Sequence, residues 1–577
     1  MLGPPWAPHR PHLRIRAPFK MQSLEAALRL VGTRVVPALL VLLSMARSRR
    51  VVHGLQTLIA KGRKNKNRTA LLGNFAPVKT EVTEENLKVT QGSLPPELKG
   101  VYMRNGSNPY FDPVASYHWF EGDGMIHALR IHEDGHVSYC NRYMDTSHLA
   151  QEKRVGKPLF AKFGDQEGVR GVLVALLEAM KAKTGIVDTS KGTGTANTSV
   201  IFHANKILAL HEGDLPYQVR MLCSGVMETV GRTQIGTAWG ETHFTAHPKL
   251  DADSGDLHFL GYDIEKPLVS VGSMDKHGDL QKVLKVPLPW TSMMHDMAIT
   301  PRFKLLMHLP LVFDPQAMIK QNSLPIVYKS ELPARLGLVP HGSSSPEDAQ
   351  WFELPSFMAF HVANAWEEGP LVKLYVCAMS QFDMGAKSYR EELGSRLTEF
   401  TLDTRTGTAS SRQITSKVGD FPIVHPLMQG RRTRYMWTAL TDIEDKQAKT
   451  VGMAKYDLDS IPNTTEVLPG TAAAAVESCC AVIRYPVGCY GGEAYFVPRH
   501  QDPAKCDDLL EMAAGEDDGF MVLYVYHSKE DISCFEVYDA KTMSPTPLAQ
   551  IKLPQRVPYG FHGTWVPEAQ LKLMASA

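Results

Sequence analysis

Short apolar runs, each bounded by turn residues, recur along the chain from about residue 71 onward. Clear examples, rich in Val, Ile, Leu, Tyr and Phe, are residues 206–210, 257–264, 304–312, 371–379 and 520–526. Runs of this length between Gly, Pro, Asn and Asp residues are typical of β-strands. Candidate helices are few, so the pattern predicts an all-β body.

A weakly repeated sequence pattern accompanies these runs. Residues 250–255, 402–407 and 538–543 each close an apolar run with an Asp and a turn before another strand. In each, the Asp can accept a hydrogen bond from its own backbone, and Gly, where present, supplies the positive φ of a hairpin loop. Such turns are common, so the repeated pattern predicts hairpins and no particular repeat family.

The size of the β-rich region limits the choice of all-β architecture. Its roughly 500 residues exceed what one sandwich or small barrel usually holds, and no linker-like break divides them. A propeller of four-stranded blades is the natural single-body solution. Seven blades would average about 70 residues, more than the roughly 40 to 50 of common propeller repeats, so the surplus would form a cap of long loops on one face.

One amphipathic helix is predicted inside the body, over residues 169–180. Its apolar positions follow helical spacing and precede Lys181 and Lys183; they are Val169, Val172, Leu173, Leu176, Leu177 and Met180. The apolar stripe predicts either a buried cap helix or a contact with a membrane near a substrate entrance.

Charge divides the chain into two parts. The 577 residues carry 62 Lys+Arg and 61 Asp+Glu with 44% hydrophobic residues, which excludes disordered, collagenous and disulfide-scaffold proteins. Residues 1–70 hold a net charge of +13 and the remaining residues −12. We therefore separate a basic N-terminal extension, residues 1–70, from a body at residues 71–577.

The extension has two possible roles. Its first twenty residues are Arg-rich and free of acids, which suggests either an organellar transit peptide or a disordered basic tail. A second possible start at Met21 precedes an amphipathic segment that Ser23 could cap, with basic residues able to contact anionic lipid. The apolar stretch 35–46 contains Pro37 and is too short for a membrane span. The sequence thus leaves plastid import and cytoplasmic membrane association open.

The eight cysteines form neither a zinc pattern nor a disulfide framework, which suggests a reducing compartment. Two other patterns carry little weight. His243 and His247 have the spacing of a zinc pair, but they lack the accompanying Glu, and Pro248 follows directly. Gly192 and Gly194 might suggest a phosphate-binding loop, but they lack a third glycine and a strand–helix frame. The basic run 61–68 lies on an arm of an otherwise acidic chain. We therefore expect neither a nucleotide nor a nucleic acid as partner.

Four histidines stand out among 22 because they occur in short apolar or turn contexts far apart in sequence. They are His247, His295, His361 and His562. The gap from His295 to His361 is about one blade of the estimated size, and the gap from His361 to His562 about three. Equivalent inner positions of a propeller point at its axis, which could gather the four into one metal site.

These contexts, together with residues 101–109, 117–127, 192–198 and 516–519, resemble the carotenoid cleavage dioxygenases, the carotenoid oxygenase family. The resemblance runs from about Asn74 to Leu571. Residues 363–368, 493–499 and the tail from 539–543 through 553–562 look most like the plant carotenoid 9,10(9′,10′)-cleavage dioxygenases, and the 9-cis-epoxycarotenoid dioxygenases share many of the same motifs.

The resemblance implies a seven-bladed propeller that holds one Fe(II) on its axis through His247, His295, His361 and His562. Neutral imidazoles suit iron, and four of them leave open positions for O2, whereas zinc is redox-inert. Family members orient three of these histidines with glutamates. Glu212 and Glu493 match that pattern, while Asp420 stands where many members carry Glu and would need a backbone shift or a water to reach its histidine.

The implied reaction inserts both atoms of O2 across a conjugated double bond of a carotenoid or apocarotenoid and gives two carbonyl products. No catalytic residue beyond the iron centre is expected. Phe360, Trp366 and Phe561 are candidate residues of an apolar substrate tunnel, with core packing as the alternative for each. An epoxycarotenoid dioxygenase acting at 11,12, a stilbene-cleaving oxygenase or isomerase, and a non-catalytic binding propeller remain alternatives. Substrate delivery from a membrane or lipid surface is expected.

Overall fold

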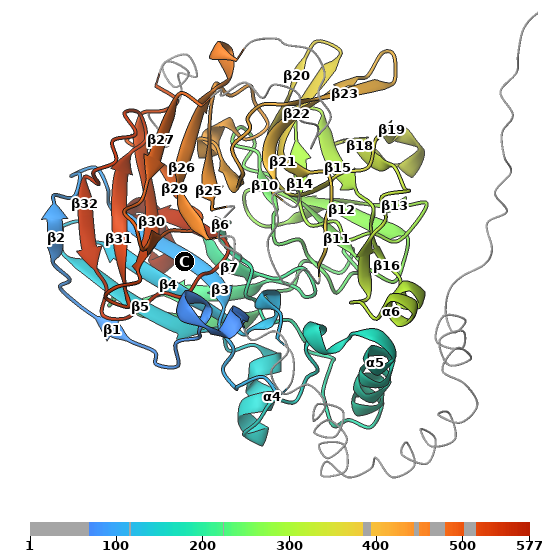
Figure 1. Ribbon diagram of the computed structural model, residues 1–577, viewed down its shortest axis with the longest axis horizontal. Helices are drawn as coiled ribbons and strands as arrows, with labels where there is room; N and C mark the ends of the chain where they lie inside the picture. Colours follow the sequence, from blue (N-terminus) through green and yellow to red (C-terminus); the bar gives the residue numbers. More distant parts are fainter. Residues whose placement is uncertain are drawn as a thin grey trace, which may run out of the picture. The chain divides into compact units, whose positions relative to one another are not determined.

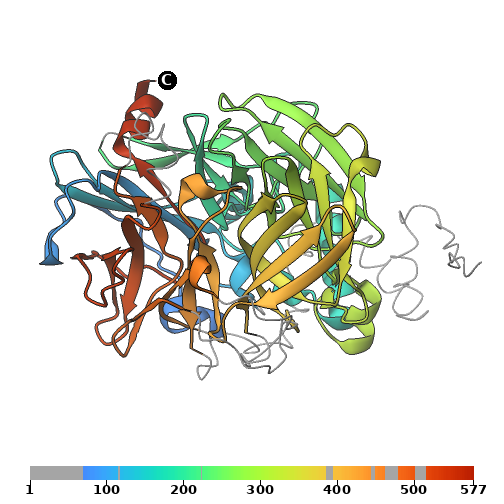
Figure 2. The same cartoon turned by 90° about the horizontal axis from the view of Figure 1, so that it is seen from above.

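Seven β-sheets of four or more strands follow one another along the chain, as the colour order in Figures 1 and 2 shows. The computed structural model describes residues 69–576 except 115–116, 223, 385–393, 443–448, 462–478 and 501–514. The predicted segment capped by Ser23 lies outside the described residues. All of the described residues fall within one unit, Arg47–Ala577.

The first sheet contains β33 (Gly563–Pro567), β3 (Gly100–Ser107), β4 (Gly124–Ile131), β5 (Val137–Tyr143) and β1 (Thr83–Glu84). The second contains β6 (Ser199–His203), β7 (Lys206–Leu210), β8 (Tyr217–Met221) and β9 (Met227–Arg232). The third contains β10 (Lys249–Leu250), β11 (Leu257–Tyr262), β12 (Leu268–Met274) and β13 (Leu280–Pro287). The fourth contains β14 (Met297–Ile299), β15 (Phe303–His308), β18 (Ala334–Pro340) and β19 (Gln350–Leu354).

The fifth sheet contains β20 (Met358–Glu368), β21 (Leu371–Met379), β22 (Arg396–Asp403) and β23 (Thr408–Gln413). The sixth contains β24 (Gly419–Ile423), β25 (Tyr435–Thr441), β26 (Thr450–Asp457) and β27 (Ala481–Arg484). The seventh contains β28 (Cys489–Tyr490), β29 (Tyr495–Pro498), β30 (Gly519–His527), β31 (Ile532–Asp539), β32 (Ala549–Lys552) and β2 (Val89–Gly92). A two-stranded ribbon, β16 (Leu311–Phe313) with β17 (Ile326–Tyr328), is inserted between β15 and β18.

The ring of sheets is closed by strand exchange between the two ends of the described chain. Strand β33, from the C-terminal end, pairs with β3 of the first sheet, while β2, from the N-terminal end, pairs with β32 of the last. In Figure 1 the red strands β31 and β32 accordingly lie beside the blue β1 and β2. The predicted all-β, seven-bladed propeller is confirmed.

Apolar side chains fill the seven interfaces between neighbouring sheets. One buried cluster lies between the first and second sheets, another between the second and third, and so on around the ring to the cluster shared by the seventh and the first. Central strands are therefore covered on both faces; in β3 every residue is buried. Strands covered on both faces appear as continuous apolar runs, which is the pattern that the sequence shows.

The hairpin pattern has the expected backbone geometry. Gly255 and Gly407 have φ of 76° and 74°, and Met543 adopts φ of 51° at the matching place without a glycine. Asp403 Oδ1 accepts the N–H of Arg405 at 2.9 Å, which closes the turn between β22 and β23. The local turn chemistry thus repeats in three different sheets.

Four α-helices lie among the described residues: α4 (Ser147–Val155), α5 (Gly168–Lys183), α6 (Pro315–Gln321) and α8 (Glu568–Ser576). Long connections carry α4 and α5 between β5 and β6, and α6 between β16 and β17. Helices α5 and α6 lie side by side in Figure 1 and are linked where the Gly168 N–H donates to Ser323 O at 3.1 Å. Among the described helices, none has the length and apolar character needed to cross a membrane.

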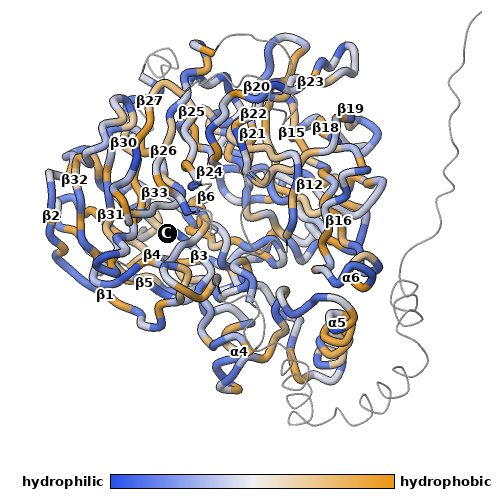
Figure 3. Tube along the Cα trace, viewed as in Figure 1, coloured by the Kyte–Doolittle hydropathy of each residue, from blue (hydrophilic) through white to orange (hydrophobic). Residues whose placement is uncertain are grey.

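Helix α5 matches the helix predicted over residues 169–180, and Figure 3 colours it largely as hydrophobic. Its stripe is divided between two environments. Val172 and Leu177 are buried, whereas Val169 is 43% exposed and Leu173 and Leu176 are half-buried. The helix therefore packs against the cap with part of the stripe and leaves part of it accessible.

Candidate metal centre

Four imidazoles meet where the edge strands of four sheets converge. His562 immediately precedes β33, His247 and His295 each lie two residues before β10 and β14, and His361 lies within β20. Each of these strands is an edge strand of its sheet, so the four side chains face one shared space. Their potential ligand nitrogens all lie within 4.8 Å of one another. The structure thus brings together all four predicted histidines.

Three of the four rings are oriented by carboxylates. Nδ1–H of His361 donates to Asp420 Oδ1 at 2.9 Å, and Nδ1–H of His562 donates to Glu493 Oε1 at 2.8 Å. Glu212 accepts from Nδ1 of His295 in the same way. Because Nδ1 is used for these bonds, Nε2 of each ring is left for the shared space, and the Nε2 atoms of His295 and His361 lie 3.3 Å apart.

Backbone geometry lets the short Asp420 side chain reach His361. The pairing of β24 with β25 shifts register between Asp420 and Ile423, and Phe421 adopts the left-handed φ of 52°. A bulge of this kind changes the direction in which the neighbouring side chain points. The N–H of Phe421 and the hydroxyl of Ser395 also donate to the carboxylate, at 2.8 and 3.1 Å, and hold it in position.

The two glutamates are fixed in the same manner. The Tyr262 hydroxyl donates to Glu212, and the Gly563 N–H donates to Glu493 Oε2 at 2.8 Å. Burial opposes the charged form of Glu212, but His295 and Tyr262 lower its pKa overall. A carboxylate that is itself restrained can fix the tautomer of the histidine it contacts.

His247 differs from the other three. Its Nε2 atom is buried and finds no hydrogen-bond partner among the described residues. Burial, together with the neighbouring imidazoles, holds the pKa of His247 well below its ordinary value, so the ring stays neutral. An unpartnered, neutral imidazole nitrogen beside three others is a donor set that can bind a divalent transition metal, and imidazole ligands suit Fe(II).

Asp296 ties the ligand-bearing strands to one another. Its Oδ2 accepts the Val362 N–H at 2.8 Å, and its Oδ1 pairs with Lys249 Nζ at 2.8 Å. It thereby connects the segments that carry His247, His295 and His361. Sequence reasoning missed this residue because an Asp that follows a histidine has no distinctive spacing.

A cavity of about 710 Å³ opens beside the histidines, within the size range of small-molecule sites. His295, His361 and His562 line it together with many aromatic and Met side chains, among them Phe360 and Phe561. Phe561 also contacts the rings of Trp119 and Phe120, with centroids 4.8 and 5.7 Å away. The two phenylalanines thus occupy the place that the tunnel hypothesis gives them.

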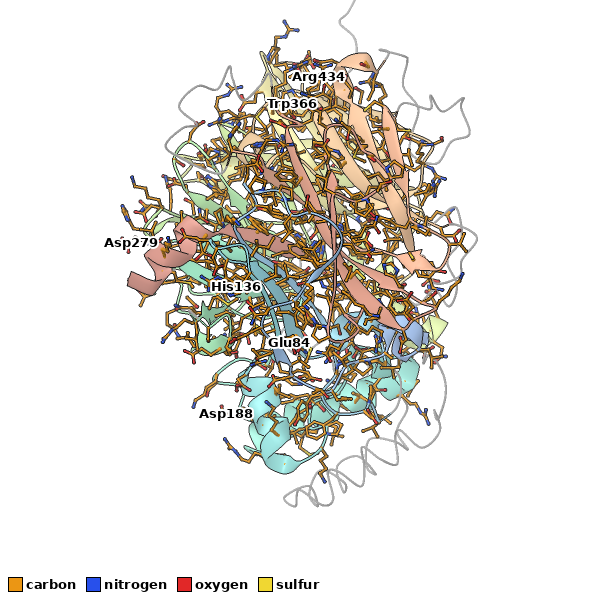
Figure 4. All side chains as sticks on the ribbon, turned by 90° about the vertical axis from the view of Figure 1, so that its left-hand side faces the viewer. Glu84, His136, Asp188, Asp279, Trp366 and Arg434 are labelled. Atoms are coloured by element: carbon orange, nitrogen blue, oxygen red, sulfur yellow. The ribbon has the colours of Figure 1, made fainter. Side chains whose placement is uncertain are left out.

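Trp366 does not line this cavity. It stacks on Tyr375 with centroids 4.9 Å apart and donates from Nε1 to Glu368 at 2.8 Å, within the core between the fifth and sixth sheets. Figure 4 shows it in the upper part of the view. Trp366 lies further along the strand that carries His361, and there its side chain faces the neighbouring sheet instead of the shared space. The core-packing alternative applies to this residue.

The glycine pair of the sequence serves packing. A Cβ on Gly192 would lie 2.2 Å from an Asp214 carboxylate oxygen, and the Gly194 N–H donates to the same carboxylate at 2.9 Å. Asp214 in turn pairs with Arg232. The glycines are needed so that the backbone can approach this buried ion pair.

The fold is a seven-bladed β-propeller whose four clustered histidines could hold a metal ion. Residues 75–567 match the family described as retinal pigment epithelial membrane protein, RPE65. The chain belongs to this carotenoid oxygenase family and is a dioxygenase.

Curated relatives cover most of the chain. A carotenoid 9,10(9′,10′)-cleavage dioxygenase 1 of Pisum sativum is 38% identical over 88% of this chain and 91% of its own length. The protein of the same name from Arabidopsis thaliana is 36% identical over 87% of this chain and 90% of its own. A chloroplastic 9-cis-epoxycarotenoid dioxygenase of A. thaliana is 35% identical over 87% of this chain and 82% of its own.

Solved structures show the same fold. Pseudomonas brassicacearum lignostilbene dioxygenase aligns with a TM-score of 0.72 at 23% identity, over 87% of this chain and 100% of its own. A variant of Synechocystis apocarotenoid oxygenase aligns with a TM-score of 0.69 at 23% identity, over 85% of this chain and 97% of its own.

Proposed function

We propose that this chain is a non-haem Fe(II) dioxygenase that cleaves a conjugated double bond of carotenoids or apocarotenoids with O2, at the 9,10 (9′,10′) position. The convergence of four imidazoles, three of them fixed by carboxylates through Nδ1, carries this proposal. His247, His295, His361 and His562 would hold the iron. When bound, Fe(II) supplies the redox chemistry that O2 activation requires.

The protein side chains have defined tasks in this proposal. Glu212, Asp420 and Glu493 keep Nδ1 of three histidines protonated and their Nε2 atoms directed inward. The aromatic and Met lining of the cavity binds a long apolar polyene and excludes water from it. The position of the cut bond depends on how far the polyene enters the cavity, and the 9,10 assignment rests on the named plant relatives.

Aerobic incubation of iron-loaded protein with β-carotene, zeaxanthin, 9-cis-violaxanthin and an apocarotenal, followed by product identification by mass, tests the assignment. Ionone-type C13 ketones with a C14 dialdehyde support cleavage at 9,10 and 9′,10′. A C15 aldehyde from 9-cis-violaxanthin supports the epoxycarotenoid alternative instead. Absence of oxygen uptake with every one of these polyenes contradicts the proposal, whether or not the protein consumes oxygen with a stilbene.

The same proposal includes contact with a lipid surface and a location in the plastid. The accessible part of the α5 stripe, which includes the 43%-exposed Val169, supports the first. The basic extension and the chloroplastic relatives support the second. Fluorescent fusions starting at Met1 and at Met21 test the location, because a transit peptide in the first twenty residues makes only the longer form enter plastids.

A further inference from the structure

Lys162 lies at the wall of the cavity beside the histidines, far in sequence from all four of them. It stands between α4 and α5, and only 8% of its surface is exposed. Among the residues that the structure describes, none makes a hydrogen bond or a direct ion pair with its ammonium group. Because Lys162 lines the cavity, its ammonium group is placed to donate to an acceptor on a bound ligand.

The acids around Lys162 are held in place by other bonds. Glu121 Oε1 accepts the N–H groups of His118 and Gly164 at 2.5 and 2.9 Å. Glu152 Oε1 accepts the N–H of Leu159 at 2.8 Å. These bonds keep the carboxylates from closing on the lysine.

The nearby carboxylates still act on Lys162 through space. Burial opposes its charge, but Asp123, Glu152 and Glu121 raise its pKa overall, so the side chain is an ammonium and a hydrogen-bond donor. In this state the nitrogen has no free electron pair, which excludes condensation with an aldehyde. A donor fixed in an apolar cavity selects for an acceptor on the ligand.

Further unused hydrogen-bonding groups line the same cavity. Glu121 Oε2 and Thr195 Oγ1 are buried and have no partner among the described residues, and both residues line the cavity. Ten of the 26 lining residues are phenylalanine, tryptophan or methionine, and the others include three of the four clustered histidines and two of their carboxylate partners. The cavity therefore combines aromatic and Met side chains with a polar group of residues, Lys162, Glu121 and Thr195, which we call its polar end.

A metal ion is a poor occupant for this polar end. Asp123, His148 and Glu152 offer potential ligand atoms within 4.8 Å of one another. However, Lys162 already provides the positive charge that the two acids require, and a second cation beside it would be repelled.

We propose that Lys162 donates a hydrogen bond to an oxygen atom at the end of the polyene, so that the enzyme prefers oxygenated polyenes, carrying a terminal aldehyde or a ring hydroxyl, over hydrocarbon carotenes. This inference rests on the proposed function, since it concerns the substrate of the same cavity. Glu121 and Thr195 flank the bound oxygen.

Substrate preference tests the inference. The ratio kcat/KM is measured for wild type and Lys162→Met with β-carotene, zeaxanthin and an apocarotenal. Loss of a hydrogen bond from a charged donor lowers kcat/KM about 10- to 100-fold for an oxygenated substrate, while that for β-carotene changes less than about threefold. A loss with the apocarotenal alone identifies the carbonyl as acceptor, and a loss with zeaxanthin alone identifies the hydroxyl. Equal losses with all three, or no loss, overturn the inference.

Lys157→Met is the matched control, because it removes a lysine from the same connection outside the cavity lining. It should leave all three ratios near wild type. If Lys162→Met does not fold, Lys162→Gln is used, because it retains a donor without the charge. Its preference for the oxygenated substrates, measured as kcat/KM relative to β-carotene, should be smaller than that of wild type. A preference equal to that of wild type overturns the inference.

A binding measurement separates this inference from the proposed function. Under nitrogen, iron-loaded wild type should shift the visible absorption of a bound apocarotenal to longer wavelength, because a hydrogen bond from an ammonium group polarises the conjugated carbonyl. Lys162→Met should bind without the shift. An absorption shift in wild type without cleavage in air would contradict the proposed function but support the inference. Bound apocarotenal with identical spectra in wild type and Lys162→Met would overturn the inference.

Discussion

Asp420 Oδ1 lies 2.9 Å from His361 Nδ1, a direct contact made by a side chain one methylene shorter than a glutamate. Burial disfavours the charged imidazole, yet Asp420 raises the pKa of His361 overall, which shows how strongly the two interact. The contact depends on the bulge after Asp420 and on the left-handed Phe421. Backbone and side chain are therefore matched to each other at this position.

Asp420→Ala should lower iron affinity or kcat about 10- to 100-fold, because His361 loses the acceptor that orients it. Asp420→Glu is the matched variant, since it keeps the charge but adds a methylene to a bulge shaped for Asp. We expect it to retain more iron than Asp420→Ala and less than wild type. Iron content by metal analysis and steady-state rates measure both, and wild-type values in Asp420→Ala would contradict the role.

His295→Ala should lose bound iron and cleavage while it remains folded, because one of four ligands and the partner of Glu212 disappear together. Metal analysis, oxygen uptake and far-ultraviolet circular dichroism report the three properties. His277→Ala removes an exposed histidine and serves as control. Retained cleavage with a full complement of iron would refute the ligand assignment.

Asp296→Ala should destabilise the protein by about 3–5 kcal/mol, because it leaves Lys249 buried without its ion-pair partner. The same change frees the Val362 N–H, so iron content should also fall. Denaturant unfolding measures the first effect. Asp403→Ala, at a hairpin turn, should lower the free energy of unfolding much less. Equal losses in the two variants would show that the buried ion pair contributes no more to stability than the turn does.

Phe360→Ala should alter which double bond is cut, or lower kcat/KM about 10-fold, because it removes an aromatic wall of the cavity beside the four histidines. Trp366→Ala should instead destabilise the fold by about 3–5 kcal/mol and leave the products unchanged, since its ring packs between two sheets. Product analysis and thermal unfolding separate the two effects. Altered products in Trp366→Ala would place that residue in substrate binding after all.

Glu121→Gln should change the pH dependence of stability. Burial raises the pKa of Glu121 to about 7, opposed by the Gly164 N–H and Lys162. An acid whose pKa is higher when folded than when unfolded makes stability fall as pH rises from its ordinary pKa through about 7. A glutamine side chain does not titrate, so the variant should gain Tm relative to wild type as pH rises from about 5 to about 8.5. A constant difference in Tm across this range would argue against the raised pKa.

Much of the architecture could be predicted because local and global signals agree. Residues 206–210 and 371–379 coincide with β7 and β21, since both strands are covered by neighbouring sheets and appear as apolar runs. The run 304–312 was wrong as one strand. It contains the end of β15 and the start of β16, separated where the chain turns at Pro310.

The polar end of the cavity could not be predicted in the same way. Lys162, Glu121 and Thr195 lie in separate loops, and nothing in their spacing distinguishes them from surface residues. They converge only because the connection that carries α4 and α5 folds back over the ring. Trp366 illustrates the opposite error, since closeness in sequence to His361 does not place a side chain in the same cavity.

Closure of the ring has a consequence for the order of assembly. His562 directly precedes β33, the strand that joins the last part of the chain to the first sheet. The other three histidines are translated much earlier and lie on consecutive sheets. A nascent chain can therefore offer three imidazoles but not the fourth until its ends have met. Iron loading should follow ring closure, and metal content then reports the fraction of molecules that have completed the circle.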